Sequence, residues 1–314
     1  MTRHILHIHD QALPPTPSCG GSNRLIDWLA SAQSQLGCKV TALSPRGASN
    51  SSYQHVTCDV KNIDFDTLIK AIPQDVTDIE YHGGLSDELA YALQQRFNKF
   101  VSVVHAGAAN TPNCVYVSKS HAQQANAEVY VHNGIPVESV EFNGKKSNFS
   151  LFLAKVKRSK KGVVQAINIA KKTNQSLIVA GGHRFGSPET WFAWHSKIKP
   201  VGYVDGQKKR DLLKNAKALW VPINWEEPFG LTVVEAMMSG TPVIAYNRGA
   251  MSELIIDGVT GFVCNNEADF IAAIDKTASL DPQTIRQHAL SHFSAEKMAS
   301  AHLDLLEKAA HSSW

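Results

Sequence analysis

Two glutamates, Glu227 and Glu235, lie in the segment 223–254, which reads INWEEPFGLTVVEAMMSGTPVIAYNRGAMSEL. Pro228 is favoured in the first turn of a helix, so we expect a helix over 229–239 that begins at about Pro228. Eight residues are a little over two helical turns, so both carboxylates can face one side. An ionised carboxylate accepts hydrogen bonds from two adjacent hydroxyls. We therefore expect one acid to hold a sugar and the other a ribose.

The start of this helix is also an expected anion site. The backbone N–H groups there have no partner inside the helix and sit at its positive end, which suits a phosphate. They belong to Phe229, Gly230, Leu231 and Thr232. A structural alternative is that Glu227 only stabilises the helix dipole. For Glu235 the alternative is a solvated helix residue, but its neighbours are apolar on nearly all sides, and a buried acid needs a partner.

A basic run, LAKVKRSKKGVV (153–164), lies where we expect a strand to turn into a helix. Lys155, Lys160 and Lys161 could neutralise a diphosphate there, whereas a plain solvated basic face is the structural alternative. No D-x-D motif ends a strand, and DFD at 64–66 resembles a helix cap. No His/Cys cluster has metal-ligand spacing. We expect no metal and no cofactor beyond the phosphorylated substrate itself.

In the first half, polar residues follow predicted strands. His105 ends the segment 99–107, and Gly20 and Gly21 precede a predicted helix. Open parallel sheets bind ligands at this carboxyl edge. His82, His132 and Asn133 are weaker candidates for the same reason. Ser118 and His121 fit a helix cap better than a site.

Strand-like and helix-like segments alternate along the whole chain, which predicts parallel sheets covered on both faces. In the first half the strands are expected at 4–8, 39–44, 78–84, 99–107, 113–118 and 127–134. The polar segment 136–148 is the expected linker, after which the alternation restarts, and the tail from about Pro282 to Ala310 is helical. We expect two Rossmann-like domains that face each other across a central cleft.

The amino-acid composition narrows the class of protein to which this chain can belong. Of 314 residues, 43% are hydrophobic and 19% charged, as in globular proteins without membrane spans. The net charge of +3 is too small to indicate nucleic acid. Residues 1–146 carry 11 Lys and Arg against 13 Asp and Glu, and residues 147–314 carry 20 against 15, which places anion binding in the second half. Five scattered cysteines and no signal-peptide pattern favour a cytoplasmic location.

The segment 222–263 resembles the signature region of the family 4 glycosyltransferases, which are retaining enzymes with the two-domain GT-B fold. Shorter matches are CGG at 19–21, HNGIP at 132–136, KKG at 160–162 and LLKNAKALWVPI at 212–223. The resemblance is to the short bacterial-type members. It implies an N-terminal acceptor-side domain over 1–143 and a nucleotide-sugar-binding domain over 144–314, whose last helices pack back on the first domain.

The resemblance also implies residue roles. The family's paired acids fall on Glu227, which would hold the donor sugar, and Glu235, which would hold the ribose. Lys155 stands at an arginine position and Lys161 at the lysine, but Ala154 replaces a glycine, and one extra residue lets Lys160 take the place of Lys161. The loop with Gly20 and Gly21 would close over the sugar phosphate and the acceptor. His105 would contact the donor sugar near the reacting carbon.

The function expected is therefore a metal-independent, retaining hexosyltransferase that moves a sugar from a UDP-sugar to an acceptor hydroxyl. The departing phosphate oxygen would help to deprotonate the acceptor, without a protein nucleophile. The alternatives are a nucleotide-sugar epimerase or phosphorylase and a non-catalytic nucleotide-sugar-binding protein. The acceptor is unidentified. The absence of a basic amphipathic helix favours a small soluble molecule or a glycan over a lipid.

Overall fold

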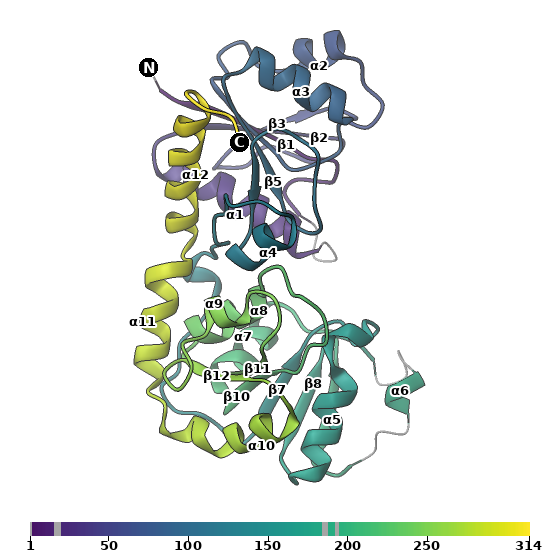
Figure 1. The fold of residues 1–314 in the computed structure, drawn as a ribbon, viewed down its shortest axis with the longest axis vertical. Helices are drawn as coiled ribbons and strands as arrows, with labels where there is room; N and C mark the ends of the chain where they lie inside the picture. Colours follow the sequence, from purple (N-terminus) through teal and green to yellow (C-terminus); the bar gives the residue numbers. More distant parts are fainter. Residues whose placement is uncertain (1, 16–19, 184–187, 192–194) are drawn as a thin grey trace. The chain divides into compact units, whose positions relative to one another are not determined.

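The computed structural model describes residues 2–15, 20–183, 188–191 and 195–314, and the chain divides into two compact units (Figure 1). Unit 1 is Met1–Pro136 together with Phe293–Trp314, and unit 2 is Val137–His292. The division falls at Pro136, ahead of the boundary expected at 143–144. The reason is that the intervening segment bonds within unit 2, where Glu141 pairs with Arg210 at 3.2 Å and with Lys214 at 2.6 Å.

Unit 1 contains a six-stranded parallel sheet in the order β3-β2-β1-β4-β5-β6. Its strands are β1 His4–Ile8, β2 Lys39–Ser44, β3 Gln54–Thr57, β4 Asp78–Tyr81, β5 Lys99–Val104 and β6 Cys114–Tyr116, and its helices are α1 Gly21–Gln35, α2 Phe65–Ala71, α3 Asp87–Arg96, α4 Lys119–Gln124 and α12 Ala295–Ala309. Helices α2 and α3 share one apolar cluster with the sheet. Helix α12 packs on α1 and β5, so the last helix does return to the first unit.

Unit 2 repeats this design with the order β12-β11-β10-β7-β8-β9, also parallel. Its strands are β7 Ser150–Leu153, β8 Leu177–Ala180, β9 Ile198–Gly202, β10 Ala218–Val221, β11 Val243–Tyr246 and β12 Gly261–Cys264, and its helices are α5 Val163–Lys172, α6 Pro188–Trp191, α7 Gly206–Asn215, α8 Leu231–Met238, α9 Met251–Leu254, α10 Glu267–Lys276 and α11 Pro282–Phe293, with short 3-10 turns at Val137–Ser139, Ser159–Lys161 and Thr277–Ser279.

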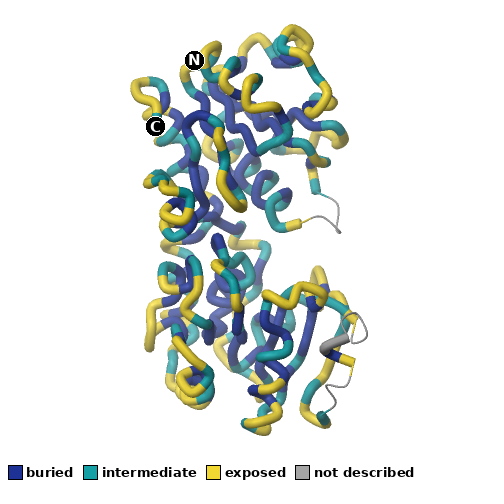
Figure 2. The backbone as a smooth tube through the Cα atoms, turned by 45° about the vertical axis from the view of Figure 1, so that its right-hand side comes forward, coloured by how far each residue is buried: buried dark blue, intermediate teal, exposed yellow. Residues whose placement is uncertain are grey.

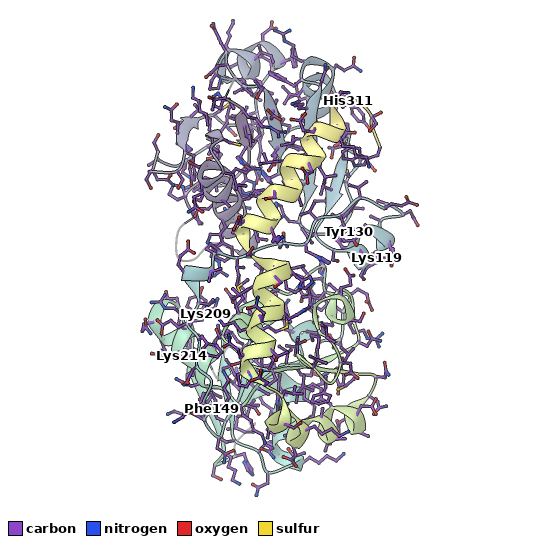
Figure 3. All side chains as sticks on the ribbon, turned by 90° about the vertical axis from the view of Figure 1, so that its left-hand side faces the viewer. Lys119, Tyr130, Phe149, Lys209, Lys214 and His311 are labelled. Atoms are coloured by element: carbon purple, nitrogen blue, oxygen red, sulfur yellow. The ribbon has the colours of Figure 1, made fainter. Side chains whose placement is uncertain are left out.

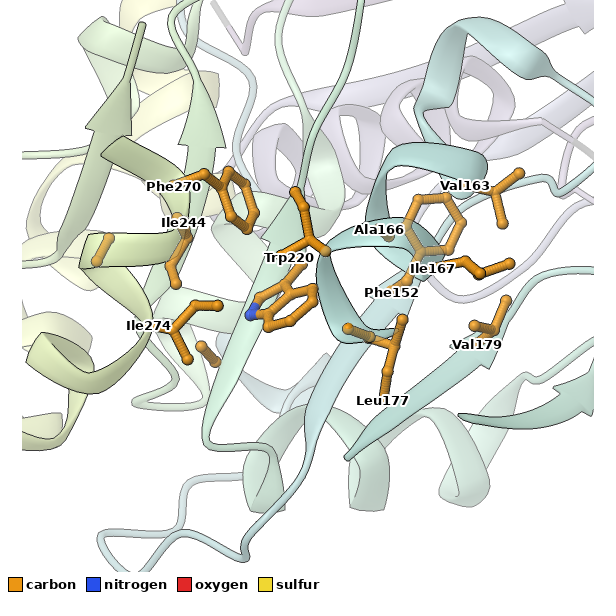
Figure 4. Close-up of a cluster of buried hydrophobic side chains, with 14 of the residues drawn as sticks. Phe152, Val163, Ala166, Ile167, Leu177, Val179, Trp220, Ile244, Phe270 and Ile274 are labelled. Carbon is orange, nitrogen blue, oxygen red and sulfur yellow. The ribbon is translucent and has the colours of Figure 1, made fainter. Parts of the chain in front are cut away.

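Most strands of both units are buried, as the dark segments of the tube show (Figure 2), whereas β3 and β9 are partly exposed. In unit 2 the largest buried side chain is Trp220 of β10. Its ring meets that of Phe270 of α10 edge-on, with centroids 5.6 Å apart, and Phe152 of β7 belongs to the same cluster (Figure 4). Aromatic pairs in this arrangement add to the stability that burial alone gives. Helices α5 and α10 thus cover one face of this sheet, which leaves α8 to the other.

Both sheets have the doubly wound strand order, which defines where a ligand would bind. In such sheets the ligand lies beyond the carboxyl ends of the strands where the winding direction reverses. In unit 1 these strands are β1 and β4, and in unit 2 they are β7 and β10. No helix in the described part of the chain is long and apolar enough to cross a membrane.

Three predictions of secondary structure differ from the structure. Strand β3 was not expected, since QHVT is short and none of its four residues is fully buried. The strand expected over 127–134 is reduced to one bridge, between Tyr116 and Tyr130. Helix α8 begins at Leu231, after Pro228 and Gly230, because Gly230 adopts a left-handed conformation with φ of +105° that no helix continues.

Candidate active site

In unit 2, the turn after β7 is held against the turn after β10. Gly162 adopts φ of +81°, and a Cβ at this position would lie 1.8 Å from the carbonyl oxygen of Pro222. Only glycine fits so close to another backbone. The amide of Asn224 also donates to the carbonyl of Lys160, at 3.1 Å. These contacts bring the basic run beside the residues that follow β10.

The side chains across this junction form a compact polar cluster. Lys161 Nζ donates to Glu227 Oε2, and Trp225 Nε1 donates to the same oxygen at 3.1 Å. Lys160 Nζ lies 3.5 Å from the centre of the Trp225 ring, a cation–π contact. Among the described residues no partner is found for Glu227 Oε1. That oxygen can accept a hydrogen bond from a bound hydroxyl.

The backbone of this loop is supported from below by the turn between β11 and α9. Ala250 donates its amide to the carbonyl of Glu227 at 3.0 Å. The neighbouring acid, Glu226, accepts from the amide of Gly249 at 2.5 Å. The turn that follows β11 therefore holds the backbone of this loop in place.

Helix α8 directs its first amides outward from this loop. The N–H groups of Leu231 and Thr232 have no partner within the helix, because the first turn never does. Phe229 is only 3% exposed and anchors the loop before them. The left-handed Gly230 makes the turn into the helix, and a Cβ there would meet the Met251 side chain at 2.8 Å. Helix α8 thus starts two residues later than expected, and the predicted anion site would lie at the amides of Leu231 and Thr232.

Glu235 occupies the second turn of α8, where it is 5% exposed. Its Oε1 accepts from Lys209 Nζ at 2.6 Å. Lys209, which is labelled in Figure 3, extends from α7, and α7 contacts α8. The structure thus supplies the partner that a buried acid requires.

Lys209 and Trp225 are the two side chains of this site that sequence reasoning missed. The need for a cation beside Glu235 was visible, but the chain offers many lysines, and only the packing of α7 on α8 selects one. Trp225 stands two residues before Glu227 in the quoted segment. Its indole N–H could have indicated this contact, since the N–H of a buried tryptophan usually finds a hydrogen-bond acceptor.

Lys155 lies apart from these contacts. It is exposed, and its carbonyl accepts from the amide of Arg158 at 3.0 Å, which starts the turn that carries Lys160 and Lys161. Of the two lysines, Lys161 is the one paired with Glu227. Its ammonium has three donors, so two remain for a phosphate.

We expect Lys161→Ala to weaken UDP binding by about 1.5–3 kcal/mol, the value of a charged hydrogen bond, and to leave uridine binding unchanged. Lys160→Ala should have the smaller effect, since its ammonium lies over Trp225. Titration calorimetry with UDP and uridine measures both. A larger loss in Lys160→Ala would mean that the two lysines exchange roles.

Unit 1 contains a polar pocket of about 550 Å³ at the carboxyl ends of β1, β4 and β5. Its lining includes His9, Asp10, Ser22, His82 and His105. These residues follow the two strands at the reversal point and the next strand along the sheet. A pocket therefore lies at the sheet edge where a site was predicted, and both His82 and His105 line it.

Other candidates in unit 1 have more ordinary surroundings. Gly20 is the N-cap of α1, and Gly21 is its first residue; the loop before them, 16–19, lies outside the described residues. His132 packs edge-on against Phe293 with ring centroids 5.5 Å apart. Ser118 accepts from the amide of His121 at 3.0 Å and caps α4, which confirms that prediction.

Burial lowers the pKa of the histidines around this pocket. The pKa of His105 falls to about 3, with desolvation as the main cause and His9 and His302 as further contributions. Desolvation also lowers the pKa of His7, partly offset by Glu80. These rings are neutral at pH 7.

This neutrality predicts acid sensitivity. An unfolded imidazole has a pKa of about 6.5, so between pH 6.5 and 3 the unfolded chain binds protons that the folded unit refuses. Stability should be retained above pH 6.5 and fall by up to about 1.4 kcal/mol per pH unit for each such histidine below it. Urea unfolding at pH 7 and pH 5 checks this, with His82→Gln expected to show a shallower loss. Equal stability at both pH values would contradict it.

A second cavity, of about 440 Å³, lies in unit 2 among α5, β8 and β9. Its lining includes Val156, Ile167, Val179, Gly182 and Pro200. It is mainly apolar, and neither glutamate of the site lines it. Of the residues expected to do chemistry, the structure joins Glu227 and Lys161 in unit 2 and places His105 in unit 1.

Comparison with known proteins identifies relatives of this chain. Residues 138–291 match the glycosyltransferases group 1 family. A D-inositol 3-phosphate glycosyltransferase from Mycobacterium sp. (strain KMS) is 31% identical over 134 residues, 39% of this chain and 30% of that protein. A glycogen synthase from Mycobacterium tuberculosis (strain ATCC 25618 / H37Rv) is 33% identical over 109 residues, 32% of this chain and 26% of that protein. The match therefore spans less than a third of these relatives.

Solved structures extend the likeness to the whole chain. AviGT4, a glycosyltransferase involved in avilamycin A biosynthesis, superposes with a TM-score of 0.77 at 20% identity and 99% coverage of both chains. Anabaena HepE, solved in complex with UDP-glucose, has a TM-score of 0.68 at 15% identity, covering 97% of this chain and 99% of that one. These likenesses confirm the fold. Residues 138–291 form a glycosyltransferase group 1 domain in a chain with the GT-B fold.

Proposed function

We propose that this protein is a retaining glycosyltransferase of family 4, of the short bacterial type, that transfers a hexose from a UDP-sugar to an acceptor hydroxyl. The cluster of Glu227, Lys161 and Trp225 at the start of α8 carries the proposal. It combines a carboxylate with a free oxygen, a cation and helix amides, at the strand ends where such sheets bind ligands. HepE, a protein of the same fold, has been solved with UDP-glucose.

Each group has one task in this proposal. Lys161 and the amides of Leu231 and Thr232 hold the diphosphate and stabilise the charge that develops on it as the sugar leaves. Glu227 binds hydroxyls of the donor sugar. Glu235 binds the ribose. Stabilising charge that forms only in the transition state accelerates the reaction without a protein nucleophile, and the departing phosphate oxygen takes the proton of the acceptor.

Incubation with a panel of nucleotide sugars tests the proposal. A transferase releases nucleoside diphosphate slowly by hydrolysis even without an acceptor. An epimerase gives a new sugar with no release, and a pure binding protein gives neither. Release from UDP-glucose or another UDP-sugar supports the proposal, and failure with every donor overturns it. Acceptor screening with small hydroxylated molecules and glycans then identifies the product.

We expect EDTA to leave donor hydrolysis within about twofold of its untreated rate. The proposed charge stabilisation comes from Lys161 and helix amides, which need no ion. The measurement is diphosphate release with and without chelator, followed by addition of Mg²⁺ or Mn²⁺. Activity lost with EDTA and restored by either ion would contradict metal independence.

A further inference from the structure

Unit 1 buries a layer of polar side chains between its sheet and the helices α1 and α12. His7 of β1 and Glu80 of β4 have 0% exposure, and so does Gln33 of α1. His302 of α12 is 3% exposed, with its Nδ1 3.5 Å from Glu80 Oε1. Burying such groups costs free energy unless they bond to one another. The proposed transfer reaction uses none of them directly.

These groups connect to the pocket through an unbroken hydrogen-bonded chain. His105 Nε2 lies 3.1 Å from His82 Nδ1, and His82 Nε2 lies 3.0 Å from His7 Nδ1. His7 Nε2 lies 2.8 Å from Gln33 Oε1. Gln33 Nε2 in turn donates to Glu80 Oε1 at 2.7 Å. One end of the chain lines the pocket, and the other is a buried carboxylate.

The imidazoles are arranged in line, which identifies the contacts as hydrogen bonds. The rings of His7 and His82 are nearly parallel, at 10°, with centroids 5.3 Å apart. This separation exceeds the nitrogen–nitrogen distance of 3.0 Å by the two ring radii, so the nitrogens lie on the line that joins the ring centres. The His82–His105 pair has the same centroid separation at 22°.

The same geometry argues against a metal ion. His7 Nδ1, His82 Nε2 and Glu80 Oε2 lie within 4.8 Å of one another, close enough in distance to be ligands. A metal requires lone pairs that converge on a third point. Here the two ring nitrogens point at each other, as donor and acceptor do.

The carboxylate sets the direction of every bond in the chain. Burial alone would raise the pKa of Glu80, but the nearby His302 and the hydrogen bond from Gln33 help to hold the pKa below its usual value. An ionised carboxylate only accepts, so Gln33 must present its NH₂ to Glu80 and its oxygen to His7. His7 then carries its hydrogen on Nε2. A neutral imidazole has one hydrogen, so His7 Nδ1 accepts from His82 Nε2.

The same step repeats once more. His82 Nδ1 has no hydrogen and accepts from His105 Nε2, which leaves His105 Nδ1 with a lone pair. No hydrogen-bond partner of His105 Nδ1 is found in the described part of the chain, and the atom is covered. A buried acceptor without a donor is unfavourable, so a donor that reached His105 Nδ1 would gain a hydrogen bond there.

We propose that Gln33, His7 and His82 are positioning residues that hold His105 in one tautomer, with its hydrogen on Nε2 and a lone pair on Nδ1. In the sugar contact that the family resemblance implies for His105, its Nδ1 would then accept a hydrogen bond from a hydroxyl. The second statement rests on the proposed function, whereas the tautomer does not. The two are tested separately.

The tautomers are measured on the ligand-free wild-type protein. Long-range ¹H–¹⁵N correlation spectra of ¹⁵N-histidine-labelled protein at pH 7.5 distinguish protonated from unprotonated ring nitrogens, and single His→Gln variants assign the signals. We expect hydrogen on Nε2 alone in His7, His82 and His105. Hydrogen on Nδ1 of His105, a tautomer mixture, or metal-bound nitrogens with stoichiometric zinc in the purified protein would overturn the proposal. This result is independent of transferase activity.

Glu80→Gln tests whether the carboxylate of Glu80 sets the donor-to-acceptor direction of the hydrogen bonds in the histidine chain. The substituted amide both donates and accepts, so the chain loses its fixed polarity and His105 should show both tautomers. Donor turnover with UDP-glucose should fall about tenfold in kcat, with KM within about twofold, because an acceptor in the wrong tautomer is misplaced for the transition state. An unchanged His105 tautomer, or unchanged kcat beside a changed tautomer, would overturn the corresponding statement.

Asp78→Asn is the matched control. Asp78 lies on the same strand, is 0% exposed, and accepts from Arg3 Nε at 2.8 Å, outside the histidine chain. It should lose stability without any change in the His105 tautomer. A tautomer change in this variant would show that the histidines respond to general loosening of the unit and would overturn the role of Glu80. If wild type releases no UDP from any donor, the proposed function fails while the tautomer result stands.

Discussion

Glu227→Ala should reduce turnover of UDP-glucose by about ten- to a hundredfold and leave UDP affinity within about twofold. Its Oε1 has no partner among the described residues, while Oε2 is bonded to Trp225 and Lys161. Oε1 is the oxygen that would accept a hydrogen bond from a sugar hydroxyl. Loss of a charged hydrogen bond of about 1.5–3 kcal/mol gives this range. UDP lacks the sugar, so its affinity does not report on Glu227.

The measurement is donor hydrolysis with UDP calorimetry and a thermal melt on the same samples. Glu267→Ala is the control, since Glu267 of α10 forms an exposed ion pair with Lys172 at 2.8 Å in the same unit. Exposed pairs contribute little to stability, so this variant should resemble wild type. If Glu227→Ala keeps full activity and only melts earlier, the acid acts as a helix-end charge and its assignment to the sugar is wrong.

Particular residues show which parts of the fold and of the site can be predicted from the sequence. The parallel sheets follow from apolar strands that alternate with helices, and the site loop follows from Glu227 and the glycines around it. Strand β3 escapes this reasoning because QHVT has little apolar pattern and joins the sheet only through its pairing with β2. The start of α8 was misplaced because proline marks a helix start locally, while the φ of Gly230 is set by the surrounding fold.

Contacts that join distant segments are harder to predict. Gln33 and Glu80 lie 47 residues apart, and His7 and His82 lie 75 apart, yet each pair is hydrogen-bonded. The sequence shows these as separate polar residues on apolar elements. Only the strand order, which places β1 beside β4, and the packing of α1 on their face bring them together. The pairing of Lys209 with Glu235 has the same origin.

Substitutions of Lys209 and Glu235 should affect stability and UDP binding separately. Lys209→Met removes the cation that pairs with the buried Glu235 at 2.6 Å and should lower the free energy of unfolding by about 3 kcal/mol. UDP affinity should change little, because the proposed hydrogen bond from the ribose to Glu235 would remain. Glu235→Gln should do the opposite. It should weaken UDP by about ten- to a hundredfold and destabilise less, since Lys209 is 16% exposed and can extend toward water.

The double variant Lys209→Met/Glu235→Gln decides between these explanations. It removes both charges of the buried pair, so it should regain most of the stability lost in Lys209→Met while keeping the weak UDP binding of Glu235→Gln. Urea unfolding and UDP calorimetry on the four proteins complete the cycle. Stability that falls additively in the double variant would mean that the two charges do not depend on each other. If UDP affinity instead falls whenever Lys209 is replaced, the contact with the ribose or phosphate belongs to the lysine and not to Glu235.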